Sequence, residues 1–145
     1  MRPGLPAQNF LRKGAHVVFD IHLHMVFITK FRRLVFTEAM LADMEPIFVR
    51  VLTANQCILE EFNGEPDHVH LLINLHPDNN ISDLMASLKS ASSRILRQQY
   101  KSEIGKFYWG EKVKLWHDSK CVVSCGGAPL EIVKAYIKEQ SGGKE

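Results

Sequence analysis

Two strand-like segments lie back to back in the middle of the chain, with a helical pattern on each side. Residues 57–62 and 68–75 are mostly apolar, and the turn pair Asn63-Gly64 stands in the short connection between them. A connection this short joins antiparallel neighbours. The flanking stretches, 37–54 and 82–100, carry apolar residues at helical spacing. This order predicts one antiparallel hairpin between two helices that pack on the same sheet.

Further elements extend this pattern at both ends. Residues 15–29 are β-branched, aromatic and histidine-rich, which predicts a long strand before the first helix. Thr37 and Ser82 are the expected N-caps of the two helices. A short strand at 121–123 and a helix over 130–140 complete the order β-α-β-β-α-β-α. The order predicts an α+β fold: a ferredoxin-like split β-α-β with a central antiparallel sheet, helices on one face and an extra C-terminal helix.

The composition is that of a single globular domain. We expect residues 1–15 to form an N-terminal arm, residues 16–140 one domain and residues 141–145 a C-terminal tail. The chain is 46% hydrophobic, and no apolar run approaches the ~20 residues that a membrane span requires. Three cysteines in no framework spacing predict reduced thiols and a cytoplasmic protein. A net charge of +2 is too small to identify a nucleic-acid partner by itself.

A pair of histidines opens the apolar run at 68–75. Alternate residues of a strand project from the same face, so His68 and His70 point the same way. Two imidazoles placed like this can bind a metal, or they can be ordinary strand histidines. His22 and His24 have the same spacing in the first strand and form a rival arm. A four-histidine cage built from both pairs would indicate a metal-dependent hydrolase.

The last predicted helix carries Tyr136 and Gln140. Residues four apart lie on one face of a helix. A tyrosine can act as a covalent nucleophile, and a glutamine oxygen can bind a hard cation. The alternative is a tyrosine that packs its ring and a glutamine at a solvated helix end.

Several segments together resemble one family. The stretch from Glu65 to Ile73 is similar to the His-hydrophobic-His (HUH) motif of the single-tyrosine transposases of the IS200/IS605 class of insertion sequences. Residues 21–33 resemble that family's opening strand and its basic continuation, and residues 88–94 resemble its middle helix. Leu115-Trp116, the Gly126-Gly127 pair and residues 136–140 resemble its terminal segment. The likeness covers about residues 16–140.

The resemblance implies a mechanism and its parts. His68, His70 and Gln140 would bind Mg²⁺ or Mn²⁺, and Tyr136 would attack single-stranded DNA to leave a 5′-phosphotyrosine and a free 3′-OH. The family works as a homodimer on DNA hairpins at element ends, with Gly126 and Gly127 as a joint for the tyrosine helix. Basic candidates for DNA binding are Lys30, Arg32, Arg33, Lys89, Arg94 and Arg97.

Four functions remain open at this point. The first is an active transposase that cuts and rejoins single strands. The second is a domesticated relative that acts on repeated hairpins of its host chromosome. The third is the four-histidine hydrolase, and the fourth is a catalytically silent DNA-binding dimer.

Overall fold

The computed structural model describes residues 11–14, 16–109 and 114–125. Its main sheet has four strands in the order β4-β5-β3-β6, and every neighbouring pair is antiparallel. The strands are β3 (His22–Ile28), β4 (Ile58–Glu65), β5 (His68–Asn74) and β6 (Cys121–Ser124). This order confirms the ferredoxin-like split β-α-β arrangement.

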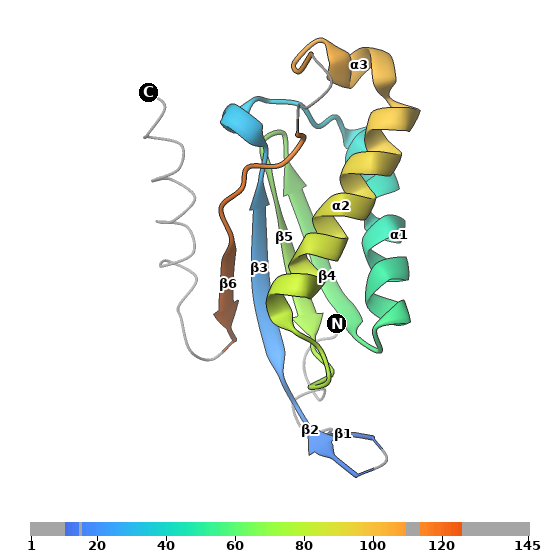
Figure 1. Cartoon of the computed structure of the whole chain (residues 1–145), viewed down its shortest axis with the longest axis vertical. Coiled ribbons are helices and arrows are strands. Elements are labelled where there is room, and N and C mark those ends of the chain that lie inside the picture. Colours follow the sequence, from blue (N-terminus) through green and yellow to red (C-terminus); the bar gives the residue numbers. More distant parts are fainter. Residues whose placement is uncertain (1–10, 15, 110–113, 126–145) are drawn as a thin grey trace.

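Two long helices cover one face of the sheet (Figure 1). The helix α1 (Glu38–Ala54) connects β3 to β4, and α2 (Ile81–Gln99) connects β5 to β6. A short helix α3 (Lys101–Gly105) follows α2, and a 3-10 turn η2 (Lys30–Arg32) follows β3. No helix in the described parts of the chain is long and apolar enough to cross a membrane.

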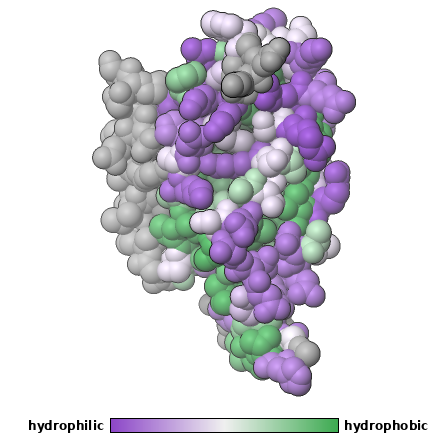
Figure 2. All heavy atoms as spheres, viewed as in Figure 1, coloured by the Kyte–Doolittle hydropathy of each residue, from purple (hydrophilic) through white to green (hydrophobic). Residues whose placement is uncertain are grey.

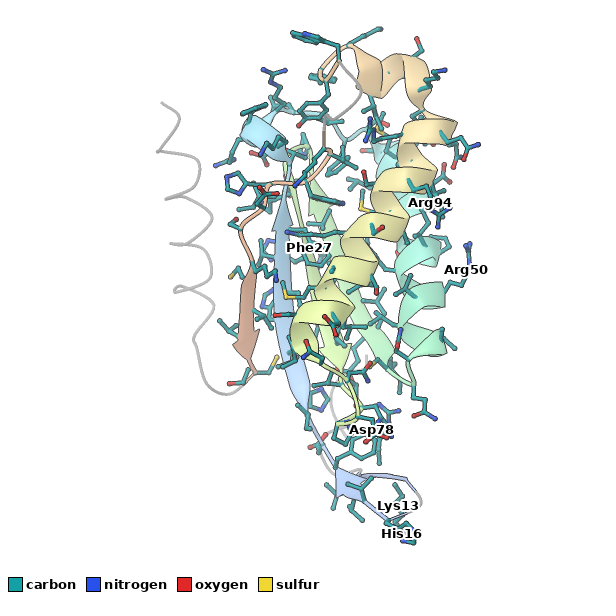
Figure 3. All side chains as sticks on the ribbon, viewed as in Figure 1. Lys13, His16, Phe27, Arg50, Asp78 and Arg94 are labelled. Atoms are coloured by element: carbon teal, nitrogen blue, oxygen red, sulfur yellow. The ribbon has the colours of Figure 1, made fainter. Side chains whose placement is uncertain are left out.

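The helix-covered face of the sheet forms the main core. Met25 and Phe27 of β3 and Val69, Leu71 and Ile73 of β5 are buried there with the inner faces of α1 and α2. In Figure 3, Phe27 lies between the sheet and α2, whereas Arg94 points away from the sheet. Alternation along each strand therefore sends the histidines to the opposite face.

A small second sheet projects from one end of the molecule. The strand β1 (Arg12–Lys13) pairs with β2 (Val18–Phe19) in antiparallel register. Figure 2 shows a hydrophobic patch on this projection, where Leu11, Val17 and Val18 are exposed. Part of the expected loose arm is therefore a strand, and the long strand predicted over 15–29 is divided between β2 and β3.

Two local predictions were wrong. Asn63 and Gly64 lie inside β4, opposite His70 and Val69, and the chain turns at Pro66-Asp67 instead. Asn80, not Ser82, caps α2, because its side chain accepts a hydrogen bond from the Asp83 backbone N–H at 3.0 Å. Thr37 is confirmed as the cap of α1, since it accepts from the Met40 N–H at 3.2 Å.

Gly64 is needed for packing rather than for a turn. A Cβ atom at this position would lie 2.4 Å from Cδ2 of Leu41, a side chain of α1. The missing side chain therefore lets α1 approach β4 closely.

The last predicted helix, over 130–140, lies outside the described residues.

Candidate functional site

Three of the four paired histidines, His24, His68 and His70, come together on the face of the sheet opposite α1 and α2. In the β3–β5 ladder His70 stands across from Val26, His68 from Ile28, and His24 from Leu72. His24, His68 and His70 are each partly buried. A small apolar cluster of Val26, Ile28 and Cys121 shares this face. We call this surface the histidine face.

His68 is held by a carboxylate that directly precedes it. Its Nδ1 lies 2.8 Å from Oδ1 of the buried Asp67. Arg32 donates from Nε to Oδ2 of the same carboxylate at 2.9 Å, and its terminal nitrogen also bonds that oxygen. Burial opposes the charged form of Asp67, but these hydrogen bonds outweigh it and lower the pKa of the carboxyl. Asp67 accepts a hydrogen bond from Nδ1 of His68, which leaves Nε2 as the ring nitrogen that is available to a ligand.

His70 has a histidine as its partner. Its Nδ1 lies 3.1 Å from Nε2 of His24, and the two ring centroids are 5.2 Å apart. Burial, with the nearby imidazoles of His68 and His24, lowers the pKa of His70 to about 4. Burial also lowers the pKa of His24. His70 is therefore neutral at physiological pH, which is the form that binds metals.

His22 has a different environment from the other three. Its Nδ1 lies 2.7 Å from Glu60 and its Nε2 lies 2.6 Å from Asp20. Burial disfavours its charged form, but the two carboxylates outweigh burial and raise the pKa of the imidazole. Both ring nitrogens are thus occupied, and the predicted four-histidine cage is not formed.

The described residues contain no group of three or more His, Cys, Asp or Glu side chains that could hold a metal. They offer two imidazoles on one strand, His68 and His70, whose centroids are 5.1 Å apart. This donor set fits a divalent cation that takes its remaining ligands elsewhere. Tyr136, Gln140 and the Gly126-Gly127 pair lie outside the described residues. The three cysteines are free thiols, as expected.

The six predicted DNA-binding residues divide into three groups. Lys30, Arg32 and Arg33 surround η2, beside the histidine face. Lys89 donates from Nζ to the backbone carbonyls of His117 and Ser119, both at 2.9 Å, and burial lowers its pKa to about 8. Arg94 and Arg97 line a pocket of about 800 Å³ beside α2 and α3. Whether any of the six binds DNA stays a prediction.

Asp67 and His24 are the residues whose roles sequence reasoning missed. Asp67 is adjacent to His68 in the chain, and an acidic residue next to a candidate ligand is a usable signal. The contact of His24 with His70 depends on the register between β3 and β5, which cannot be read from the sequence alone. Arg32, one of the predicted DNA contacts, also supports Asp67 in the structure.

Comparisons with known proteins agree on one family. The model of the family described as "Transposase IS200 like" matches residues 17–140. The ISDra2 transposase TnpA of Deinococcus radiodurans is 26% identical over 130 residues, which cover 90% of this chain and 91% of that protein. The Salmonella typhimurium transposase for insertion sequence element IS200 is 30% identical over 94 residues, which cover 59% of this chain and 57% of that protein.

Solved structures give the same result for the fold. A crystal structure from Deinococcus radiodurans R1, assigned to the transposases, has a TM-score of 0.75 at 27% identity and covers 92% of this chain and 98% of its own. A tyrosine transposase associated with REP sequences, solved bound to a REP hairpin, has a TM-score of 0.54 at 11% identity. It covers 92% of this chain and 76% of its own, and at this identity it supports the fold alone.

Proposed function

The chain belongs to the IS200-like transposase family, and from this membership we propose that it cuts and rejoins single-stranded DNA through a 5′-phosphotyrosine on Tyr136. The observation that carries the proposal is the paired support of the two imidazoles. Asp67 holds Nδ1 of His68, and His24 meets Nδ1 of His70. Neutral imidazoles with one nitrogen fixed by a neighbour are typical of metal ligands.

We propose Mg²⁺ or Mn²⁺ as the cofactor, held by His68, His70 and Gln140. When bound, the cation would polarise the scissile phosphoryl group and stabilise the departing 3′ oxygen. The protein contributes the orientation of the ligands. Arg32 donates to the Asp67 carboxylate, Asp67 accepts from Nδ1 of His68, and Nε2 is then the ring nitrogen left for the cation.

The environments of the other tyrosines support Tyr136 as the nucleophile. The chain has three tyrosines. The hydroxyl of Tyr108 donates to the Lys30 carbonyl at 2.5 Å, and burial raises the pKa of Tyr108 to about 12. The hydroxyl of Tyr100 donates to Asp43, which raises the pKa of Tyr100. Neither phenol is suited to attack a phosphate, because each is bound and harder to ionise than an ordinary tyrosine.

The proposed reaction conserves the phosphodiester energy. The phenol oxygen of Tyr136 forms a bond to phosphorus as the bond from phosphorus to the 3′ oxygen breaks. The phenol proton leaves to solvent or a nearby base, and the 3′ oxygen leaves as a hydroxyl. A 3′-OH can then attack the phosphotyrosine, which restores the phosphodiester and the tyrosine without a nucleotide cofactor.

Hairpin DNA is the proposed substrate, and a homodimer is the proposed assembly. A structural neighbour of the same fold is described as bound to a REP hairpin. Both transposition and action on chromosomal repeats would use this substrate and the same site. The basic turn around η2 lies beside the histidine face, where it could neutralise phosphates of a bound strand.

The test uses hairpin DNA from the sequence that flanks the gene, labelled in parallel at the 3′ end and at the 5′ end. With Mg²⁺ or Mn²⁺, the 3′ label should move with the denatured protein, because the protein holds the 5′ phosphate of that fragment. The 5′ label should appear in a shorter free strand that ends in a 3′-OH.

Two substitutions make the test specific. Tyr136→Phe should abolish both products, whereas the matched control Tyr100→Phe should retain them. Cleavage without a protein-linked 3′ label would overturn the tyrosine mechanism in favour of a hydrolase. Tight hairpin binding without cleavage at any flank would indicate a silent binding protein.

A further inference from the structure

An exposed aromatic and basic surface lies at the end of β3. It consists of Lys30, Phe31, Arg33 and Trp109, and we call it the Phe31–Trp109 patch. The Phe31 side chain is 57% exposed and that of Trp109 is 71% exposed. The guanidinium carbon of Arg33 lies 5.1 Å from the centroid of Phe31 and 5.7 Å from that of Trp109. Nζ of Lys30 lies 5.5 Å from the Phe31 centroid.

The backbone that presents Phe31 is in an unfavourable conformation. Phe31 has φ 60° and ψ 16°, and Arg32 has φ 55°. Left-handed angles at two consecutive residues with side chains are rare, and glycine would adopt them more easily. Such strain is found where the displayed side chain has a use. The ring of Phe31 lies mostly outside the core.

The surrounding structure holds this strained turn in place. The Lys30 N–H donates to the Leu115 carbonyl at 2.8 Å, and the Lys30 carbonyl accepts from the Tyr108 hydroxyl at 2.5 Å. Arg33 also donates to the Phe107 carbonyl. The backbone that presents Phe31 is therefore fixed in advance, so binding does not have to order this turn.

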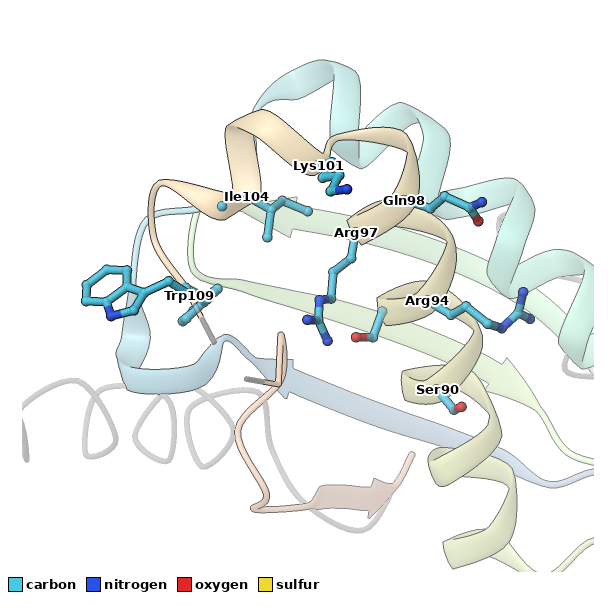
Figure 4. Close-up of a pocket in the computed structure, with 10 residues that line it drawn as sticks. Ser90, Arg94, Arg97, Gln98, Lys101, Ile104 and Trp109 are labelled. Carbon is cyan, nitrogen blue, oxygen red and sulfur yellow. The ribbon is translucent and has the colours of Figure 1, made fainter. Parts of the chain in front are cut away.

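The patch is joined directly to the histidine face. Arg32, between Phe31 and Arg33, bonds the Asp67 carboxylate that holds His68. On its other side, Trp109 lines the pocket that also contains Arg97 and Lys101. Figure 4 shows Arg97 extending from α2 into this pocket and Trp109 at its far end. Cations and aromatic rings thus continue from the histidine face to α3.

We infer that the Phe31–Trp109 patch binds unpaired bases of the DNA strand next to the cleaved phosphate. The bases would stack on Phe31 and Trp109, and the backbone phosphates would lie against Lys30 and Arg33. Aromatic rings between cations are the common means of binding single strands without reading their sequence. This inference rests on the proposed function, since it supplies a place for the same strand.

The test compares a hairpin that carries a single-stranded tail with the same hairpin without a tail. The key variant is Phe31→Gly, because glycine accepts φ 60° and should raise the melting temperature while it removes the ring. We expect its affinity for the tailed hairpin to fall about tenfold, with little change for the blunt hairpin. A residue with a merely structural role would not combine higher stability with weaker binding.

A neighbouring residue provides the matched control. Leu34 is 65% exposed and apolar but not aromatic, so Leu34→Ala should leave both affinities unchanged. A second readout is the fluorescence of Trp109, which oligothymidine should quench in the wild type and not in Trp109→Phe. Equal tailed-hairpin affinity in wild type and Phe31→Gly would overturn the inference. The inference would also be overturned if Phe31→Gly changed the sedimentation coefficient of the protein but not its DNA binding. That result would indicate that the patch is a contact between copies of the chain.

The outcomes separate this inference from the proposed function. Quenching of Trp109 by single strands without any phosphotyrosine would support the patch and reject the tyrosine mechanism. A phosphotyrosine that forms equally well on tailed DNA in Phe31→Gly, with unchanged affinity, would reject the patch and leave the mechanism intact.

Discussion

At the scale of single residues, each of the two candidate metal-binding histidines depends on a neighbour for its orientation. His68 relies on Asp67, which is itself held by Arg32, and His70 relies on His24. The supporting residues come from the β4–β5 turn, from η2 and from β3. Three separate segments must therefore fold correctly before the two imidazoles present their lone pairs.

The His24–His70 contact leads to a prediction on metal affinity. His24→Ala removes the ring that meets Nδ1 of His70, and the imidazole of His70 is then free to rotate. We expect the affinity for Mn²⁺ to fall about tenfold, the lower end of the effect of losing such a partner. Isothermal titration of the protein with Mn²⁺ measures this. His22→Gln is the control, and equal affinities in His24→Ala and wild type would count against the role.

His22 should make stability depend on pH. Its pKa is raised in the folded protein, so the contribution of its charged form is fully present below the unfolded pKa near 6.5 and is lost as pH rises through the folded pKa. We expect His22→Gln to lower the free energy of unfolding by about 0.5–1 kcal/mol at pH 6, and by less at pH 8.5. Urea unfolding at both pH values tests this, and a difference that grows with pH would refute it.

At the scale of elements, close approach of α1 to β4 depends on Gly64. Gly64→Ala places a Cβ 2.4 Å from Cδ2 of Leu41, so we expect it to lower the free energy of unfolding by roughly 1–2 kcal/mol. In a Leu41→Ala background the space is empty, and the same substitution should be neutral or stabilising. Chemical denaturation of the four proteins of this cycle gives the coupling. Equal costs in both backgrounds would show that the two side chains do not meet.

The helix α2 and the segment before β6 are joined by polar contacts. The Trp116 indole donates to the buried Ser92 hydroxyl at 2.9 Å, and Lys89 donates to two carbonyls of the same segment. These contacts explain why a serine and a lysine face inward on an otherwise amphipathic helix. Lys89 therefore has a structural role, whatever it adds to DNA binding.

The elements were more predictable from sequence than their ends or their contacts. Apolar periodicity located α1, α2 and the strands of the main sheet, because burial of one face determines it. The turn predicted at Asn63-Gly64 was wrong, because the turn falls at Pro66-Asp67. Gly64 instead gives the Leu41 side chain room to pack against β4. The shared face of His68 and His70 could be predicted, because the alternation of side chains along a strand is a local property. The contacts that Arg32 and His24 make with this site could not be predicted, because they depend on how segments far apart in the sequence are aligned.

At the scale of the whole molecule, the proposed homodimer leads to a mixing prediction. If Tyr136 of one subunit serves the His68 and His70 of the other, a heterodimer of Tyr136→Phe and His68→Ala contains one intact site. We expect mixed and re-equilibrated variants to regain part of the cleavage activity that neither has alone. A labelled-hairpin cleavage assay measures the recovery, and a mixture as inactive as its components would favour sites built within one chain.

The position of β5 in the sheet also affects how the site moves. β5 is hydrogen-bonded to β3 on one side and to β4 on the other, and its inner face is in the core. Amide protons of such a strand exchange with solvent only in the largest openings of a protein. The two imidazoles therefore stand on one of the slowest-opening parts of the molecule. In the proposed reaction, rearrangement would then fall to the DNA and to protein segments outside β5.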